Sequence, residues 1–411
     1  MIRPFVAALP LLCLAACAAD AGGETFEPRA RGAAGKADGI DDLRGELTAE
    51  AERTPWSGYY WSMAQGELVL GWDDGQGRRL LTPDEVRAFD ACLPSYEPGC
   101  VELLGNLAGD GGRQLSPLMK FDLWVRARLE AEAGPGGSAY TAYSHAALWE
   151  LEHHFIGDDT SHRYWDSRGY AGKCIGWALA TMDWDEPTVD RELLGVLFRP
   201  ADLKGILASI YNGAQFFVPE DQVMGTEFHD ANDASAEAYA DVHPADFVRA
   251  LLLTLGEGRI LEGDLEPGDG VWNYPIHRVD LAWERETQDA TELHVAATLH
   301  YANDEVDLDG VFSTDPERPD LLSRELTFDL EVPEGWDGDL AAATAGRWTG
   351  QAVDTHPDVL ILGLEEGWRD SIYDYRTTNM NQEVNFQLLK RVRGEGGWQP
   401  VVDELLAEYY R

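Results

Sequence analysis

Apolar residues recur at helical spacing through the middle of the chain. The segment 175–182 follows Cys174 with this pattern, and the segments 198–211 and 243–255 repeat it, each with a proline near its first turn. Proline is tolerated there because the first N–H groups of a helix have no partner within it. We therefore predict three packing helices, and we expect the polar, irregular stretch 225–240 to be a loop.

The pattern changes beyond Asp280, where apolar and polar residues alternate. Residues 293–301, 326–332 and 359–363 alternate as half-buried strands do, with Gly, Pro and Asp turns between them. Residues 401–410 return to a helical pattern and predict a closing helix. Helices first and strands later indicate an α+β fold, in which a helical half packs across a cleft against a mostly antiparallel sheet.

The N-terminus has the pattern of an export signal. One basic residue, Arg3, precedes an apolar run over 5–14 that is too short to span a membrane permanently. The ending Leu-Ala-Ala-Cys at Cys17 resembles a lipobox, whose cysteine receives a diacylglycerol and becomes the first residue of the mature protein. We therefore predict a lipoprotein signal peptide over 1–16 and a lipid on Cys17. The alternative is an ordinary signal peptide cleaved near Ala18.

A polar tether is predicted to join the lipid to the folded part. Residues 17–54 are rich in Ala, Gly, Asp and Glu and have no apolar periodicity that could bury a face. No later segment is apolar enough to span a membrane. We therefore expect the protein to be exported and anchored to the cell envelope, at the outer membrane or the cell surface, through its lipid alone.

Charge limits the choice of partners. The formal net charge of -42 at pH 7 argues against binding to nucleic acid, because the phosphates would be repelled. Such an acidic surface can favour basic partners, or it can simply keep the protein soluble.

The cysteines differ in the roles that their positions allow. Cys92 and Cys100 flank a turn-rich stretch, and in an oxidising compartment they could close a small loop as a disulfide. Cys174 is then left over. Such a thiol in an exported protein is a buried inert residue, a pairing partner or a nucleophile.

The surroundings of Cys174 favour a nucleophile. A loop with two glycines runs before it and a predicted helix after it, so the thiol stands at a first helical turn, where the helix dipole and the charge of Lys173 would stabilise a thiolate. Papain-like enzymes place their cysteine in this way, and they need a histidine base and an Asn or Asp that orients it. The chain offers Cys174, His243 and Asn273 in that order, with Asp241 two residues before the histidine. A buried cysteine on a core helix is the alternative.

Five blocks of sequence, in order along the chain, carry a family resemblance. They are Cys174-Ile-Gly-Trp-Ala178, Glu186-Pro187 with residues 195–204, Asp241-Val-His-Pro244 with Phe247, Val271-Trp-Asn-Tyr-Pro-Ile276, and Gly346-Arg-Trp348 with His356-Pro-Asp358. Together they resemble the transglutaminase elicitors, secreted oomycete cell-wall enzymes with bacterial relatives. The resemblance runs from about residue 55 to about residue 368. We therefore predict a catalytic domain over 55–371 and a C-terminal extension over 372–411 that ends in a helix.

The resemblance implies a protein-glutamine gamma-glutamyltransferase with a distant papain-like or transglutaminase-like core and no cofactor. Cys174 would attack a glutamine side-chain amide, expel ammonia and form a thioester. A lysine amine would then attack and leave an isopeptide crosslink, whereas attack by water would give deamidation. Trp177 or Trp272 would keep water out of the substrate cleft. The partners implied are proteins that carry glutamine and lysine.

The catalytic base does not carry over cleanly from the family. The family pattern has asparagine at the position of His243 and a histidine at the position of Val248. His243 could serve from its own position, or His356 could be the base with Asp358 as its orienter. A turn role for His356 before Pro357 is the alternative. An impaired site would make the chain a non-catalytic envelope scaffold or binding lipoprotein, and a papain-like cysteine peptidase or deamidase would use the same acyl-enzyme chemistry.

Two groups of possible metal ligands match no known site closely. No familiar zinc signature has the spacing of the first group, which comprises Glu150, His153, His154 and His162. Residues 305–310 resemble the start of a calcium loop, but Pro316 stands where the closing acid is expected. We predict no metal site.

Overall fold

The computed structural model describes residues 43–75, 78–133, 144–157, 171–214, 218–225, 242–266, 272–304, 306, 308, 320–364, 390–393 and 397–411. The predicted signal peptide, Cys17 and most of the predicted tether lie outside these residues. Among the helices that are described, none combines the length and the apolar character needed to cross a membrane.

Several helices begin where the sequence supplies a cap or a proline. Thr82 accepts a hydrogen bond from the N–H of Glu85, whose carboxylate accepts the N–H of Thr82 in return, and Pro83 follows. Pro200 and Pro244 open two of the predicted helices. The helices are α1 (Glu67–Leu70), α2 (Pro83–Cys92), α3 (Pro98–Leu107), α4 (Gly109–Gly112), α5 (Pro117–Ala133), α6 (Ala146–His153), α7 (Cys174–Asp183), α8 (Pro200–Asn212), α9 (Pro244–Gly256) and α12 (Val401–Tyr409), with 3-10 turns η3 (Glu220–Gln222), η4 (Leu340–Ala342) and η5 (Gly350–Val353).

Alternating burial beyond Asn273 produces long strands. In β7 buried side chains alternate with more exposed ones for most of its length, as expected when one face of a strand packs on a core. The strands are β1 (Arg44–Glu50), β2 (Arg191–Leu193), β3 (Val196–Phe198), β4 (Val223–Gly225), β5 (Leu261–Asp264), β6 (Asn273–Glu284), β7 (Glu292–Ala302), β8 (Leu321–Glu331), β9 (Ala345–Thr349), β10 (Val359–Ile361), β11 (Lys390–Arg393) and β12 (Gly397–Pro400).

Eight of the described strands form one antiparallel sheet. Seven follow the order β4-β10-β5-β6-β7-β8-β9. β6 is long enough to take two partners along the same edge: β5 pairs with residues 273–276 and β1 pairs with residues 278–284. The strands β2 and β3 form a separate pair, as do β11 and β12.

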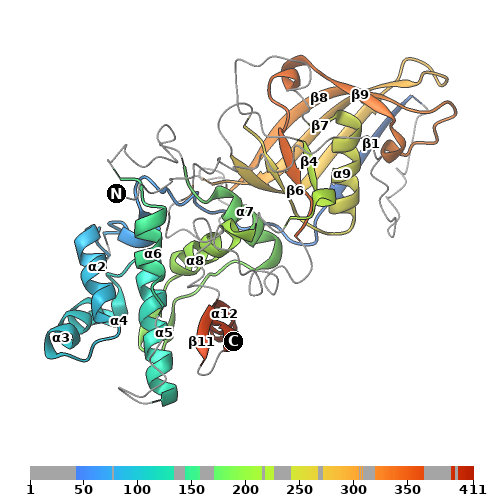
Figure 1. Cartoon of the computed structure of the whole chain (residues 1–411). Coiled ribbons are helices and arrows are strands. Elements are labelled where there is room, and N and C mark those ends of the chain that lie inside the picture. The colour runs from blue at the N-terminus through green and yellow to red at the C-terminus, as the bar shows by residue number, and fades with distance from the viewer. Residues whose placement is uncertain are drawn as a thin grey trace, which may run out of the picture.

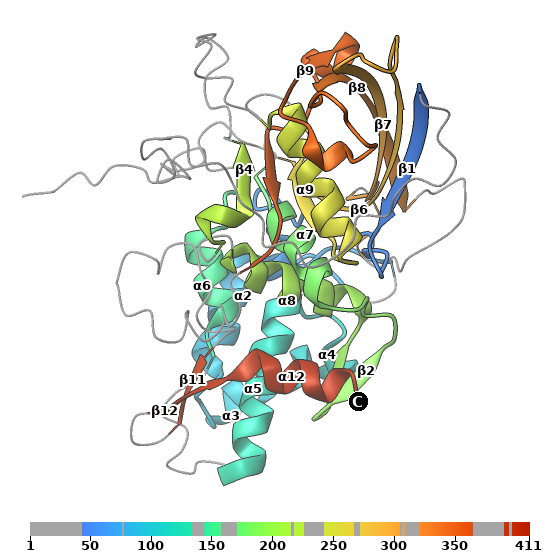
Figure 2. The ribbon, with the colours of Figure 1, turned by 90° about the vertical axis from the view of Figure 1, so that its right-hand side faces the viewer.

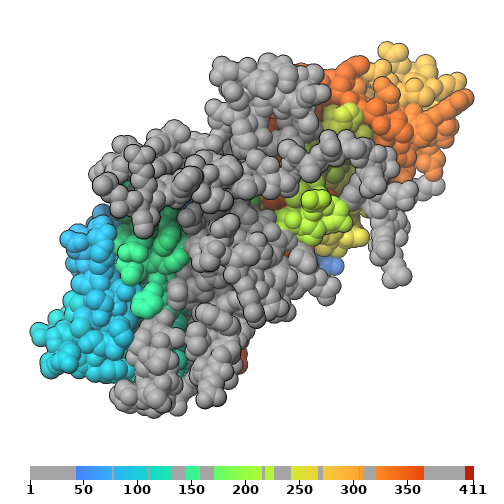
Figure 3. All heavy atoms as spheres, viewed as in Figure 1, coloured from blue at the N-terminus to red at the C-terminus, as the bar shows by residue number. Residues whose placement is uncertain are grey.

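The two halves of the molecule have separate apolar cores and lie at opposite ends (Figures 1 and 3). α9 lies inside the curl of the sheet (Figure 2), where Phe247 packs edge-on against Phe328 of β8 and Trp348 of β9. The other core is built mainly by α1 to α8. Met182 of α7 and Tyr274 of β6 contact both cores. The start of β6 and α7 therefore form the junction between the halves.

A segment before α1 ties the two halves together, and we call residues 55–63 the strap. On the helical side, the Nε1–H of Trp177 donates to the carbonyl oxygen of Trp56 at 3.2 Å. On the sheet side, the N–H of Gly58 donates to the carbonyl oxygen of Asn303, just after β7, at 3.1 Å. The strap therefore contacts both halves close to their junction.

The C-terminal helix α12 packs on the helical half, where it crosses α5 (Figure 2). Arg128 of α5 forms ion pairs with Glu404 and Glu408. The ring of Tyr410 stacks on Trp184 with the ring centroids 5.6 Å apart. The C-terminal extension thus ends in a helix, as predicted, and this helix belongs to the helical core.

The structure confirms the α+β class and most of the predicted elements. The helices predicted over 175–182, 198–211 and 243–255 are α7, α8 and α9, and the predicted disulfide between Cys92 and Cys100 links α2 to α3. The strands predicted beyond Asp280 are β7, β8 and β10.

The tether was predicted to extend too far. Its last part, residues 44–50, forms β1 and pairs with β6 in the main sheet. Burial alternates along β1, with Leu47 and Ala49 packed on the core of the sheet, but two apolar residues among seven were too weak a pattern to predict a strand.

Candidate active site

Cys174 is the first residue of α7, at the junction of the two halves (Figure 1). Its helix packs against β5 and β6 as well as against α8. The residue is only 8% exposed. Asn273, the first residue of β6, donates a hydrogen bond from Nδ2 to Cys174 Sγ at 3.5 Å. Two members of the predicted trio are therefore in contact.

Burial controls the protonation of this thiol. It raises the pKa of Cys174 to about 11. The backbone N–H and the side-chain amide of Asn273 work in the opposite direction, whereas the negative charges of Asp264 and Glu262 raise the pKa further. The sequence led us to expect a stabilised thiolate. In this structure the thiol is protonated at neutral pH instead, because desolvation outweighs the favourable field at the start of the helix.

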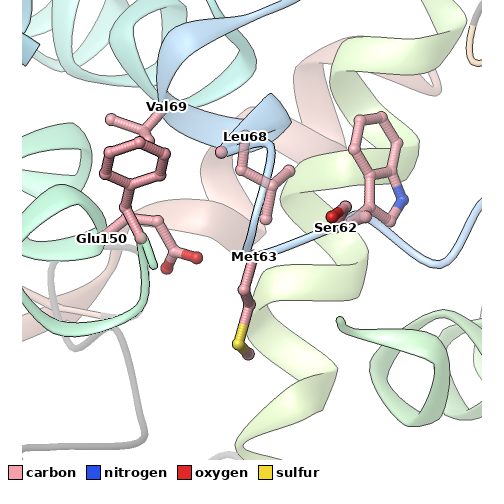
Figure 4. Close-up of a pocket in the computed structure, with 8 residues that line it drawn as sticks. Ser62, Met63, Leu68, Val69 and Glu150 are labelled. Carbon is pink, nitrogen blue, oxygen red and sulfur yellow. The ribbon is translucent and has the colours of Figure 1, made fainter. Parts of the chain in front are cut away.

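Lys173 directs its charge away from the thiol. Its ammonium group lies 3.1 Å from Glu150 Oε1 and 3.0 Å from His154 Nδ1. Burial acts to raise the pKa of Glu150, but the charges of His154 and Lys173 outweigh it and hold the pKa at about 2. Glu150 also lines a small pocket beside the strap residues Ser62 and Met63 (Figure 4). The residue directly before Cys174 is thus held in place by a buried ion pair.

The strap also connects the two segments that carry the site. The N–H of Lys173, next to Cys174, donates to the carbonyl oxygen of Tyr60 at 2.5 Å. The ring of Tyr60 meets the ring of Trp272, next to Asn273, with a centroid separation of 5.4 Å. Trp272 therefore lies beside the site and stays a candidate for the cleft wall.

Two acidic residues of β5 approach the site from the sheet. Glu262 and Asp264 are both buried, and the register places Asp264 directly opposite Asn273. Our sequence interpretation missed both, because Leu-Glu-Gly-Asp-Leu over 261–265 has the composition of a turn. Their spacing was the available signal, since residues two apart in a strand lie on one face.

The two candidate bases belong to the surroundings of α9. His243 is exposed at the N-cap of α9, and Asp241 lies outside the described residues. His356 stacks on Trp348 at a centroid distance of 5.0 Å, and its Nδ1 hydrogen-bonds to the carbonyl oxygen of Ala352 at 2.8 Å. The role of each histidine as a base stays a prediction.

Asp358 lies next to β5, the strand that carries Glu262 and Asp264. It is buried, and its N–H donates to the carbonyl oxygen of Asp264 at 3.2 Å. This backbone contact extends the pairing of β10 with β5. It connects the late His-Pro-Asp block to the strand that carries the two acids, while its role as an orienter of His356 stays a prediction.

Trp177 has a different place from the one that we expected. Its side chain is fully buried in the helical core, and a Cβ added to Gly58 of the strap would lie only 2.1 Å from its Nε1. The structure therefore gives Trp177 a packing role, not a place on a cleft wall. Gly58 has no side chain, and the strap can therefore pass close to the ring of Trp177.

The two groups of possible metal ligands can be followed only in part. His153 bonds to the carbonyl oxygen of Trp149, and His154 to Glu150, while His162 lies outside the described residues. The acids of 305–310 also lie outside them. In the part of the chain that the structure describes, no three His, Cys, Asp or Glu side chains gather in a way that could hold a metal ion.

Fold and site together define a class of protein. It has an α+β fold in which a cysteine outside the disulfide, at the start of a helix, faces an amide on the first residue of a neighbouring antiparallel strand. Residues 160–310 match the model of the transglutaminase elicitor family. The match includes Cys174 and Asn273, and it confirms the resemblance inferred from the sequence blocks.

Comparison with solved structures finds the crystal structure of the GP42 transglutaminase from Phytophthora sojae. The two chains are 16% identical, with a TM-score of 0.42, and the match covers 77% of this chain and 83% of that chain. A search of curated proteins finds no significant match.

Proposed function

We propose that this chain is a protein-glutamine gamma-glutamyltransferase whose nucleophile is Cys174. The observation that carries the proposal is the 3.5 Å contact between Asn273 Nδ2 and Cys174 Sγ at the first turn of α7. A side-chain amide in that position can orient the sulfur. The family match over 160–310 supports the choice of glutamine as the acyl donor.

The proposed reaction has two acyl transfers. The sulfur of Cys174, once deprotonated, attacks the side-chain carbonyl carbon of a glutamine; the C–N bond breaks, and the nitrogen gains a proton and leaves as ammonia. The amine of a lysine then attacks the thioester, the C–S bond breaks, and the thiol is restored. The free N–H groups of the first turn of α7 and the Asn273 amide are suitable donors for the oxyanion of each step.

The described conformation fits a resting form of such an enzyme. With a pKa of about 11, about one thiol in ten thousand would be ionised at pH 7. The residue also exposes only 8% of its surface. Substrate binding therefore has to uncover and reorganise the site before attack.

We also infer that the protein works outside the cell, anchored by a lipid on Cys17 and acting on envelope proteins that carry glutamine and lysine. The N-terminal sequence pattern supports this, and so does the Cys92–Cys100 disulfide, because such bonds persist in oxidising compartments. Fractionation of cells that express the full chain tests it. Wild type should be recovered with membranes and Cys17→Ser in the soluble fraction, whereas equal distribution would refute the anchor.

The test of the activity is incorporation of a tagged primary amine into a glutamine-bearing protein. Wild type should incorporate the amine and release ammonia, and Cys174→Ser should do neither. His243→Ala and His356→Ala, assayed beside them, would identify a histidine base if one acts. His153→Ala is the matched control, because this exposed histidine hydrogen-bonds through Nδ1 to the carbonyl oxygen of Trp149 in its own helix, α6.

The outcomes separate the related activities. Ammonia release without incorporation would indicate a deamidase, and cleavage of the protein substrate in place of both would indicate a peptidase. Incorporation that survives in Cys174→Ser would refute the proposed nucleophile.

A non-catalytic envelope protein is the second candidate. The burial and raised pKa of Cys174 favour it, because a structural thiol has these properties. Iodoacetamide distinguishes the two: a native thiol that stays unmodified at pH 8, even with a glutamine substrate present, supports the non-catalytic protein. Alkylation that the substrate accelerates supports the enzyme.

A further inference from the structure

The strand β5 presents two carboxyl groups on the side of the sheet that α7 covers. Glu262 and Asp264 are two residues apart in an extended strand, so their side chains lie on the same face. The whole strand is buried. α7 packs directly against β5, and both acids lie close enough to Cys174 for their charges to act on its thiol.

Glu262 has no structural partner that would explain a buried acid. The residue is fully buried, and neither of its carboxyl oxygens has a hydrogen-bond partner among the described residues. A buried carboxylate without partners costs several kcal/mol, and protonation relieves most of that cost. Burial, followed by the charge of Asp264, accordingly raises the pKa of Glu262 well above its ordinary value. These surroundings therefore favour the protonated form of Glu262.

Asp264 is also buried, but it differs from Glu262 in its hydrogen bonds. Its Oδ1 accepts the N–H of Trp272 at 2.9 Å and the N–H of Glu266 at 3.2 Å. Donors of this kind favour the ionised form of a carboxyl group. Two neighbouring carboxyl groups whose surroundings separate their protonation states are a common arrangement for moving protons in active sites.

Asp264 and Glu262 are the charged groups that act on the pKa of Cys174, after burial and the hydrogen bonds of Asn273. From β6, Tyr274 lies near Cys174 and is itself surrounded by Asp304 and Glu266. Lys173 directs its ammonium group to Glu150. The sheet side of the thiol therefore carries negative charge.

We propose that Glu262 and Asp264 form a carboxyl pair that controls the proton of Cys174. Within the proposed transferase, on which this part rests, the Asp264 carboxylate takes the proton from the sulfur as the C–S bond forms. It then delivers that proton to the departing nitrogen, so that ammonia leaves and the carboxylate is restored. Glu262 is the acid that burial and the charge of Asp264 keep protonated, and its own negative charge, which opposes the thiolate, appears only as the pH rises. The pair would thus take the part that papain-like sites give to histidine.

The test is the pH dependence of alkylation at Cys174, measured in the full chain by mass spectrometry of the peptide that contains it. Glu262→Gln removes an ionisable group without removing a hydrogen bond, so the fold should survive. Its alkylation midpoint should fall by at least about half a pH unit from the wild-type value, because one acid that opposes the thiolate is gone. Asp264→Asn should shift the midpoint further in the same direction, and Glu257→Gln, an exposed acid paired with Arg259 just before β5, should leave it unchanged.

Amine transfer is then measured on the same proteins. Asp264→Asn should lose at least tenfold in transfer even though its thiol ionises more readily, a combination that simple loosening of the structure would not produce. Glu262→Gln should keep most of its transfer, because the amide is neutral like the protonated acid. An alkylation midpoint that neither variant moves would overturn the proposal, as would full transfer activity in Asp264→Asn. The midpoint needs no turnover, so it decides the proposal even if wild type shows no transfer. That last result would count against the proposed function alone.

Discussion

At the residue scale, burial has a larger effect on the pKa of Cys174 than the electrostatic field at the start of α7. The position of the cysteine at a helix start could be predicted because it depends only on the loop and helix that flank it. Its protonation could not, because it depends on Asp264 and Glu262, which reach it only through the packing of β5 on α7. Asn273 was found from the sequence because an order of residues can be read along a chain. Glu150, the partner of Lys173, was not found in this way, because a buried ion pair leaves no pattern in the sequence.

The buried ion pair between Lys173 and Glu150 should be important for stability. Glu150→Gln is expected to lower the free energy of unfolding by about 3–5 kcal/mol, because it leaves the ammonium of Lys173 buried without its counter-charge. Glu150→Gln combined with Lys173→Met should recover at least half of the loss. Urea denaturation followed by tryptophan fluorescence measures both.

An exposed ion pair gives the control for that experiment. Glu85→Gln breaks the pair with Arg79 at the surface and should cost less than about 1 kcal/mol. If Glu150→Gln costs no more than this, or if the double variant is no more stable than the single one, the anchoring role is wrong.

At the scale of elements, α7 and α8 can approach closely because Gly176 has no side chain. A Cβ at this position would lie 2.0 Å from the carbonyl oxygen of Ala208 in α8. Gly176→Ala should therefore destabilise the protein by about 2 kcal/mol or more. Gly105→Ala in α3, where a Cβ meets no atom within 4 Å, should instead stabilise it by about 0.5–1 kcal/mol. Thermal denaturation compares the two, and equal effects would rule out the close helix contact.

The contact between α5 and α6 should be sensitive to pH. Asp122 of α5 accepts the N–H groups of Ala146 and Ala147 at the start of α6, both at 2.9 Å, and burial raises its pKa to about 7. The folded protein therefore keeps a proton that the unfolded chain releases from about pH 4 upward. The contribution of this group to stability is complete below that value and falls as the pH rises to 7, by on the order of 2–4 kcal/mol.

The variant Asp122→Asn should remove that part of the pH dependence. Urea denaturation at several values between pH 4.5 and 7.5 should give a shallower decline than in wild type. Asp84→Asn, an exposed acid in the first turn of α2, should keep the wild-type slope. A variant curve parallel to that of wild type would show that Asp122 does not titrate in this range.

Prediction of elements from the sequence succeeded where a face had to be buried. α8 and α9 have helical periodicity and an opening proline, and β7 alternates for most of its length. β1 and β5 were missed because their sequences carry few apolar residues, and β5 buries two acids where a strand pattern calls for apolar residues. The missed strand β5 is therefore also the one with the unexpected chemistry.

At the scale of the whole molecule, charge opposes compactness. The net charge of -42 is spread over a folded body, so carboxylates repel one another, and salt screens that repulsion. We expect the melting temperature at pH 7.5 to rise by about 3 °C or more between 10 and 500 mM NaCl. The rise should be smaller at pH 5, where part of the acidic surface is protonated. A melting temperature that is independent of salt at both values would contradict this.

The fold class could be predicted from the order of helices and strands, but the joint between the halves could not. It depends on the strap, whose backbone bonds to Trp177 and Asn303 come from parts of the chain that no local pattern relates. For the same reason the sequence predicted a cleft between the two halves, but it did not predict which residues of one half face the other.

The pairing of β1 with β6 has a consequence for where the proposed enzyme could act. If Cys17 is held in a membrane, about 26 residues separate it from Arg44, where β1 begins. Such a length of chain cannot extend beyond about 90 Å. The enzyme can then join only those glutamines and lysines that come close enough to the lipid surface. The greatest distance is the length of the extended tether plus the diameter of the folded protein. The distance from the membrane, as much as the chemistry of the site, would then select its substrates.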